Sequence, residues 1–258
     1  MENDVKHKLF MGFRGILMKI PPLLSEKGAR KGEKGAKANA ASLSDEERQV
    51  HHYIVKKMAV VDAPITDKLI AEELGMSNES VLEIIDKLEN LKTFIYRSDG
   101  KGINWAYPLS LENTGFRITA SSGEQFFAAW GADAFAAPFV YGRLHNKELS
   151  FTIQAECANS GRQIEIEIDT ELNIKKFTDG ADPMFCLPIV TLANTKEPSI
   201  VDIFWRKSLL FWSEEDVREY KKKNQDLRAY MNLSRRALAG VKRMQTSIFS
   251  FWKIKVTK

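Results

Sequence analysis

The sequence predicts an α/β (or α+β) protein in which a basic extension precedes two structured units. Residues 43–108 show three capped helical segments and a short hairpin. Residues 109–258 show an apolar helix, alternating strands and a C-terminal amphipathic helix. With 258 residues and 44% hydrophobic content, the chain is long enough to bury a core in each unit.

Residues 1–42 are predicted to be a flexible basic extension. Gly28–Ala41 is a Gly/Lys/Ala linker without a large apolar residue, so we expect disorder there. The apolar segment 9–24 has two alternatives: a terminus or helix that packs on the body, which we favour, or contact with a membrane surface. No apolar run reaches the ~20 residues that span a bilayer.

The first structured unit has the pattern of a winged-helix domain. Ser44, Thr66 and Ser77 can each cap a helix, and the third helix has an apolar stripe at helical spacing. Two β-rich segments, Phe94–Tyr96 and Ile103–Trp105, flank a turn that contains Asp and two Gly residues. Three helices followed by a hairpin are typical of a winged helix.

The third predicted helix argues against DNA recognition, although it is the helix that such a domain offers to the major groove. Between Ser77 and Lys92 it carries four carboxylates against two lysines. Because phosphate repels excess carboxylate, nucleic-acid binding is not expected and a structural or lid-like role is favoured. A winged-helix transcriptional regulator stays a third alternative for the whole protein.

The second structured unit is organised around Gly123–Gly161. Its first part contains few polar residues and predicts a buried helix that reaches Pro138 and Gly142. Leu149–Ala155 and Gln163–Ile168 alternate and predict a hairpin with one face on the core of a mixed sheet. The later expected elements are strands at Ile174–Phe177, Leu187–Leu192 and Val201–Trp205 (with an extension to Phe211 left open), a helix capped by Ser213, and an amphipathic helix over 227–252.

The charge distribution and the cysteine count limit the possible partners and the cellular compartment. The net charge of +4 divides into +5 for residues 1–42, −11 for 43–216 and +10 for 217–258. Such asymmetry fits a tail that faces nucleic acid or membrane, and equally a basic end that docks on its own acidic body. Cys157 and Cys186 cannot build a disulfide framework, and no secretory signal is recognisable, so a cytoplasmic location is expected.

No motif predicts a cofactor. None of the four histidines has metal-ligand spacing to a second His or Cys. The turn Asp99–Gly102 lacks the following helix that a phosphate loop needs, and there is no G-x-S-x-G nucleophile elbow.

Four local motifs are informative through their order and spacing. They are Tyr107–Leu111 (YPLSL), Phe127–Trp130 (FAAW) with Pro138 and Gly142-Arg143 after it, Cys157–Gly161 (CANSG), and Phe204–Ser213 with the capped helix that follows. Together they resemble the alkylmercury lyase (organomercurial lyase) family over about residues 44–250. The resemblance implies a winged-helix-like domain joined to an α/β core of that family's own type.

The resemblance also implies a chemistry that depends on two cysteines. Thiolate sulfur is the soft ligand that suits Hg(II), and the family holds the metal with two cysteines while an aspartate gives a proton to the departing carbon. In this chain the first cysteine position falls at Gly131, and the second falls at Trp205 or Arg206. Asp133 matches the aspartate if one residue is deleted before Pro138.

Other residues carried over by the resemblance have supporting roles. Trp130 and Phe204 are expected to line the core pocket, Cys157 matches a structural cysteine, and Cys186 has no clear counterpart. Asp133 is either a proton donor in a pocket or a helix carboxylate bonded to nearby backbone, and the two alternatives stay even.

Two hypotheses for function follow. The favoured one is a divergent member that binds a small ligand or metal compound without cleaving a carbon–mercury bond, because losing both ligands removes the step that activates the bond. The alternative is an active lyase that uses Asp133 with Cys157 or Cys186 as relocated thiolates. The oligomeric state stays open.

Overall fold

The computed structural model describes residues 41–91, 95–97, 102–129, 131, 133–145, 147–187 and 209–224, together with the backbone of 9–12, 16–19 and 229–232. Five helices and thirteen strands lie in these residues. None of the described helices is long and apolar enough to cross a membrane. The mixed α/β class predicted from the sequence is confirmed, with every described strand pair antiparallel.

The N-terminal unit contains three helices, α2 (Asp45–Met58), α3 (Asp67–Leu74) and α4 (Asn78–Asn90). Each begins where the sequence predicts. The Ser44 hydroxyl accepts the Glu47 amide at 3.1 Å, and the Glu47 carboxylate accepts the Ser44 amide at 2.8 Å, which completes a capping box. Thr66 and Ser77 each accept the amide three residues further on. Gly75 ends α3 with a φ of 65°, a conformation that favours glycine.

The wing of this unit belongs to a larger sheet. Strand β3 (Ile95–Tyr96) pairs with β4 (Trp105–Ala106), and β4 pairs with β5 (Leu109–Ser110). A bridge between Ile65 and Ile103 joins the wing to the segment before α3. The sheet therefore continues across residue 108, where the sequence suggested a domain boundary.

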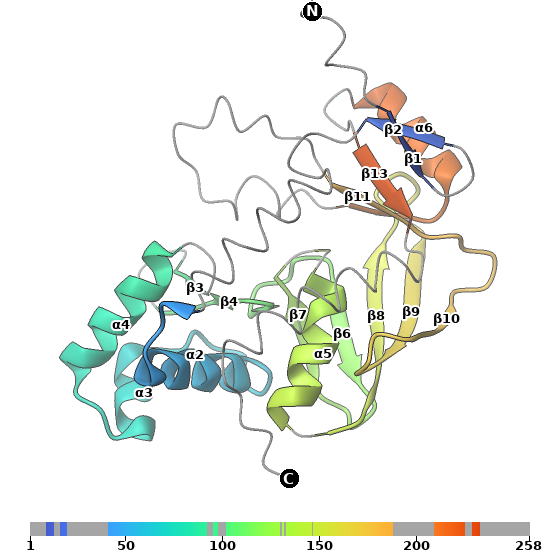
Figure 1. The fold of residues 1–258 in the computed structure, drawn as a ribbon. Coiled ribbons are helices and arrows are strands. Elements are labelled where there is room, and N and C mark those ends of the chain that lie inside the picture. The colour runs from blue at the N-terminus through green and yellow to red at the C-terminus, as the bar shows by residue number, and fades with distance from the viewer. Residues whose placement is uncertain are drawn as a thin grey trace, which may run out of the picture.

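The eight-stranded sheet has the order β10-β9-β8-β6-β7-β5-β4-β3 (Figure 1). Its remaining strands are β6 (Arg117–Ala120), β7 (Gln125–Ala128), β8 (Ser150–Glu156), β9 (Gln163–Asp169) and β10 (Ile174–Phe177). The predicted β8–β9 hairpin and the strand at 174–177 are confirmed. In β8 and β9 the apolar residues alternate as buried, which gives the sheet one core face.

Helix α5 (Asp133–His145) covers that core face through contacts with β6, β7 and β9, and also contacts α2. The predicted helix is therefore shorter than expected, because Gln125–Ala128 forms β7. Only Phe126 and Ala128 of this strand are fully buried, a period of two that suits its place between β5 and β6. Pro138 and Gly142 lie inside α5 and do not end it. Residues 109–117, before the predicted helix, hold β5 and the first residue of β6.

A second, three-stranded sheet has the order β12-β11-β13. It consists of β11 (Met184–Leu187), β12 (Leu209–Phe211) and β13 (Ala229–Asn232). Strand β11 begins before the predicted 187–192, and residues 188–208 lie outside the described part. Helix α6 (Glu214–Lys223) follows Ser213 as predicted. Residues 229–232 were expected in the C-terminal helix but pair with β11, because that strand offers a second edge for backbone hydrogen bonds.

The N-terminal extension contributes a short hairpin of β1 (Leu9–Gly12) and β2 (Ile16–Lys19). Strand β2 lies next to β13. The helix considered for this segment is therefore wrong for these eight residues. The predicted linker 28–40 and the rest of the predicted helix 227–252, that is 227–228 and 233–252, lie outside the described residues.

Close packing of α5 on the sheet generates a stability prediction. A Cβ at Gly142 would lie 2.3 Å from Thr170 Cγ2, so Gly142→Ala should destabilise the protein by about 1–3 kcal/mol despite alanine's better helix propensity. Thr170→Ser removes that methyl group. Urea unfolding of both single variants and the double variant should show a smaller cost of Gly142→Ala in the Thr170→Ser background; an equal cost would show that this contact is not limiting.

Candidate functional site

The chain topology brings the described residues of the sequence-predicted site to one end of the sheet. A short loop connects α5 to β8, so β8 runs back along the helix. The N-terminal end of α5 and the C-terminal end of β8 consequently lie at the same end, next to the three-stranded sheet (Figure 1). This places Gly131 and Asp133 at the same end as Cys157, and we call that end the candidate site.

Asp133 is the first residue of α5 and is only 2% exposed. The N-terminus of a helix stabilises a carboxylate through the aligned backbone dipoles. All but two of the twelve residues that follow Asp133 in α5 are buried, and most are apolar. Gly131 is also buried. Trp130 and Phe204, which were predicted to line the pocket, lie outside the described residues. So do Trp205 and Arg206, the two candidates for the second cysteine position.

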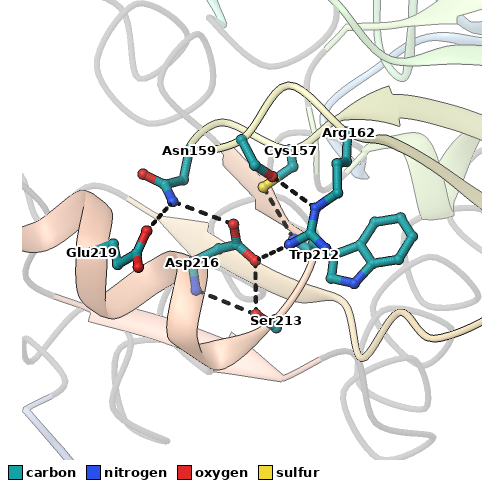
Figure 2. Close-up of polar contacts among 8 residues, drawn as sticks. Cys157, Asn159, Arg162, Trp212, Ser213, Asp216 and Glu219 are labelled. Carbon is teal, nitrogen blue, oxygen red and sulfur yellow. Dashed lines mark hydrogen bonds and ion pairs between the residues drawn. The ribbon is translucent and has the colours of Figure 1, made fainter.

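Cys157 is buried and engaged at the end of β8. Its Sγ accepts the backbone amide of Trp212 at 3.3 Å, as Figure 2 shows. The next residue, Ala158, donates its amide to the Leu210 carbonyl at 2.9 Å. Both bonds join the cysteine-containing turn to the segment that includes β12. This arrangement fits the structural role that the resemblance implied for Cys157.

A buried carboxylate locks the same turn to α6. Asp216, 5% exposed, accepts Arg162 Nη2 at 2.8 Å, Ser213 Oγ at 2.7 Å and Asn159 Nδ2 at 3.3 Å (Figure 2). The Arg162 guanidinium also lies 4.4 Å from the ring centre of Trp212. Burial alone would raise the pKa of Asp216, but these hydrogen bonds and the arginine charge outweigh it and hold the pKa below its usual value.

Sequence reasoning found only part of this network. The Ser213 cap and the acids after it were visible in the local pattern. The partner of Asp216 is 54 residues earlier, at Arg162, and no local periodicity marks that pairing. An arginine directly after the Asn159–Gly161 turn was the one available signal, and it is weak because exposed arginines are common in turns.

The backbone register separates the two cysteines. Cys186 in β11 lies opposite Leu209 of β12, whereas Cys157 Sγ contacts Trp212, three residues further along. At about 3.3 Å per residue, this anchors the two cysteines about 10 Å apart along β12. Within the described part of the chain, no group of three or more His, Cys, Asp and Glu residues could hold a metal ion.

Comparisons with known proteins identify the fold. No family model matches the chain, and no curated protein matches it. Among solved structures, the crystal structure of the mercury-bound form of MerB2 matches with a TM-score of 0.61 and 17% sequence identity, covering 86% of this chain and 98% of that chain. The chain has a MerB-like fold. MerB2 is an alkylmercury lyase, so the fold expected from the resemblance is confirmed. Sequence identity at this level is no evidence for a shared activity.

The Asp216 network predicts an acid-dependent stability term. Asp216→Asn should destabilise the protein by about 1.5–3 kcal/mol at pH 7, because it removes charged hydrogen bonds in a buried setting. Since the folded pKa lies below the ordinary 3.8, this contribution is complete above pH 3.8 and is lost as the pH falls through the folded pKa. Urea unfolding at pH 7 and below pH 3.8 should show the gap between wild type and variant closing. A gap that stays constant would contradict the assignment; exposed Asp179→Asn is the control.

Proposed function

We propose that this protein binds a small ligand or metal compound at the candidate site and does not cleave a carbon–mercury bond by the two-cysteine route. One observation supports this most directly: buried Asp133 opens an apolar helix two residues after buried Gly131. By the resemblance, Gly131 occupies a position where the family has a thiolate. The carboxylate is retained and the sulfur is not.

The chemistry of the remaining groups supports binding without cleavage. Protonolysis of a carbon–mercury bond needs soft ligands that push electron density toward the carbon as the proton arrives. Cys157 is already engaged by the Trp212 amide, and its register separates it from Cys186. Asp133 alone could donate a proton, but it cannot provide the thiolate ligation that weakens the bond.

The position of Asp133 narrows the class of ligand. A carboxyl group at the start of an apolar helix suits a ligand that presents apolar surface together with one cationic or donor group, because binding pockets combine apolar walls with a few placed polar groups. We therefore propose a ligand with an apolar body and one cationic or donor group, or an organometallic cation. The MerB-like fold, whose example in the solved structures is mercury-bound, supports the second class.

The first test distinguishes this proposal from an active lyase with relocated thiols. The protein incubated with phenylmercury and excess thiol should release no benzene above a control without protein. Turnover that disappears in a Cys157→Ser, Cys186→Ser double variant but not after Asp216→Asn would replace the proposal with the lyase alternative.

The second test restores sulfur at the family position. Gly131→Cys should raise phenylmercury affinity on the order of tenfold or more, measured by competition with a small thiol, because a thiolate binds Hg(II) far better than a carboxylate. Ala136→Cys, buried on the same helix, is the matched control and should give no comparable gain. Equal gains in both variants would show that position 131 is not at the site. Adding cysteine at Trp205 or Arg206 then tests the second position.

The winged-helix regulator is not supported by the charges beside α4. Lys87 is paired with Glu47 at 2.7 Å, and Arg97 of the wing contacts Asp86 and Glu89 at 2.7 and 2.5 Å. These cations are therefore engaged within the protein and do not form a basic footprint for phosphate. Gel-shift binding that fell steeply with salt and mapped to residues 77–92 would restore the regulator alternative.

A further inference from the structure

The C-terminal half of α5, which lies beside the end of α2 (Figure 1), carries a histidine that neither the resemblance nor the proposed function uses. His145 is the last residue of α5, and α5 contacts α2. Its ring stacks on Tyr141 with centroids 4.3 Å apart and planes at 21°. Tyr141 in turn stacks on Phe126 at 5.1 Å and meets Phe151 edge-on at 5.9 Å. His145 thus ends an aromatic stack that starts in the core.

The surroundings of the His145 ring favour its neutral form. Nε2 is buried and has no hydrogen-bond partner among the residues that the structure describes. Burial lowers the pKa of His145, and the charges of Lys56 on α2 and Lys147 after α5 lower it further, against a smaller opposing effect of Glu124.

Glu124 is the acid that faces His145, and it is already engaged. It accepts the Ser122 hydroxyl and lies 3.6 Å from Lys147 Nζ. Ser122 is the main cause that lowers the pKa of Glu124 to about 2, and a Tyr141 hydrogen bond adds to it. Burial is the largest cause that raises the pKa of Tyr141 to about 12, and the Glu124 carboxylate is the second. Glu124 therefore stays charged and Tyr141 neutral throughout the physiological range.

Helix α2 carries two further histidines, His51, which is buried, and His52, which is half-buried. His52 lies one turn before Lys56, and burial, then Lys56, then Arg48 lower the pKa of His52 to about 4. Arg48 is itself paired with Asp45 at 2.6 Å. On α5, Arg143 pairs with Glu171 at 2.7 Å. The charges that face His145 and His52 are thus dominated by lysine.

We propose that the α2–α5 junction is an acid-sensitive contact, in which protonation of His145 places a third cation beside Lys56 and Lys147 and releases α2 from α5. The neutral ring stacks on Tyr141 and tolerates burial, whereas the imidazolium must recover water or a hydrogen-bond acceptor. Separation of the helices lets the charged ring reach solvent. The device is independent of what the candidate site binds.

The sign of the pH effect follows from the lowered pKa. The closed junction binds the proton less well than an exposed histidine with a pKa near 6.5, so its stability is complete above that pH. The stability of the closed junction falls as the pH drops below 6.5. The equilibrium constant for opening rises by at most roughly tenfold for each unit between the pKa of the released histidine and that of the histidine in the closed junction. The relevant window is therefore pH 7.5 to 5.0, above the range in which most carboxylates titrate.

Amide hydrogen exchange of the full chain tests this device at pH 7.5 and 5.0, corrected for intrinsic exchange. In the wild type, amides of α2 and of the last turn of α5 should lose protection at pH 5.0, while β8 and β9 should not. His145→Phe keeps the stack and removes the titration, so its α2 protection should be the same at both pH values. The His52→Gln variant should still lose α2 protection at pH 5.0, because the response comes from His145.

Two results would overturn the proposal. One is a His145→Phe protein that loses α2 protection at pH 5.0 as much as the wild type. The other needs no variant: an NMR titration in which the His145 ring carbon protons titrate at or above pH 6.5 would show that the closed junction does not disfavour the imidazolium.

Discussion

Burial of α5 against the sheet is the constraint on which the described structure depends. A helix with this little polarity has no face that prefers water, so it must be covered on several sides. Strands β6, β7 and β9 cover one side, and α2 of the N-terminal unit contacts the helix as well. The close approach at Gly142 and the stacking of Tyr141 between Phe126 and His145 are consequences of that coverage.

The two buried carboxylates near the candidate site differ in their surroundings. Asp216 collects hydrogen bonds from Ser213, Asn159 and Arg162, so its charge holds a turn and a helix together. Asp133 is buried at the start of an apolar helix, where the helix dipole favours a negative charge. The contacts of Asp216 indicate a structural role, whereas the position of Asp133 at the start of an apolar helix is the basis of the binding role that we propose.

Local patterns predicted the elements whose stability is local. The Ser44, Thr66, Ser77 and Ser213 caps and the β8–β9 hairpin were predictable because side-chain capping and alternation are encoded within a few residues. The errors fell on segments whose state depends on a distant partner. Gln125–Ala128 became a strand between β5 and β6, and residues 229–232 became a strand on β11, because pairing with remote backbone outweighed a weak local preference.

The sequence by itself determined the α/β class, the capped helices, the resemblance to a two-cysteine family and the absence of sulfur at position 131. These are properties of residue identity and short-range spacing. Only the tertiary structure decided that Cys157 is engaged by Trp212 and held apart from Cys186, that Asp216 reaches Arg162, and that α2 contacts α5. Such contacts join residues tens of positions apart, and they exist only once burial of the apolar faces has fixed how the chain returns on itself.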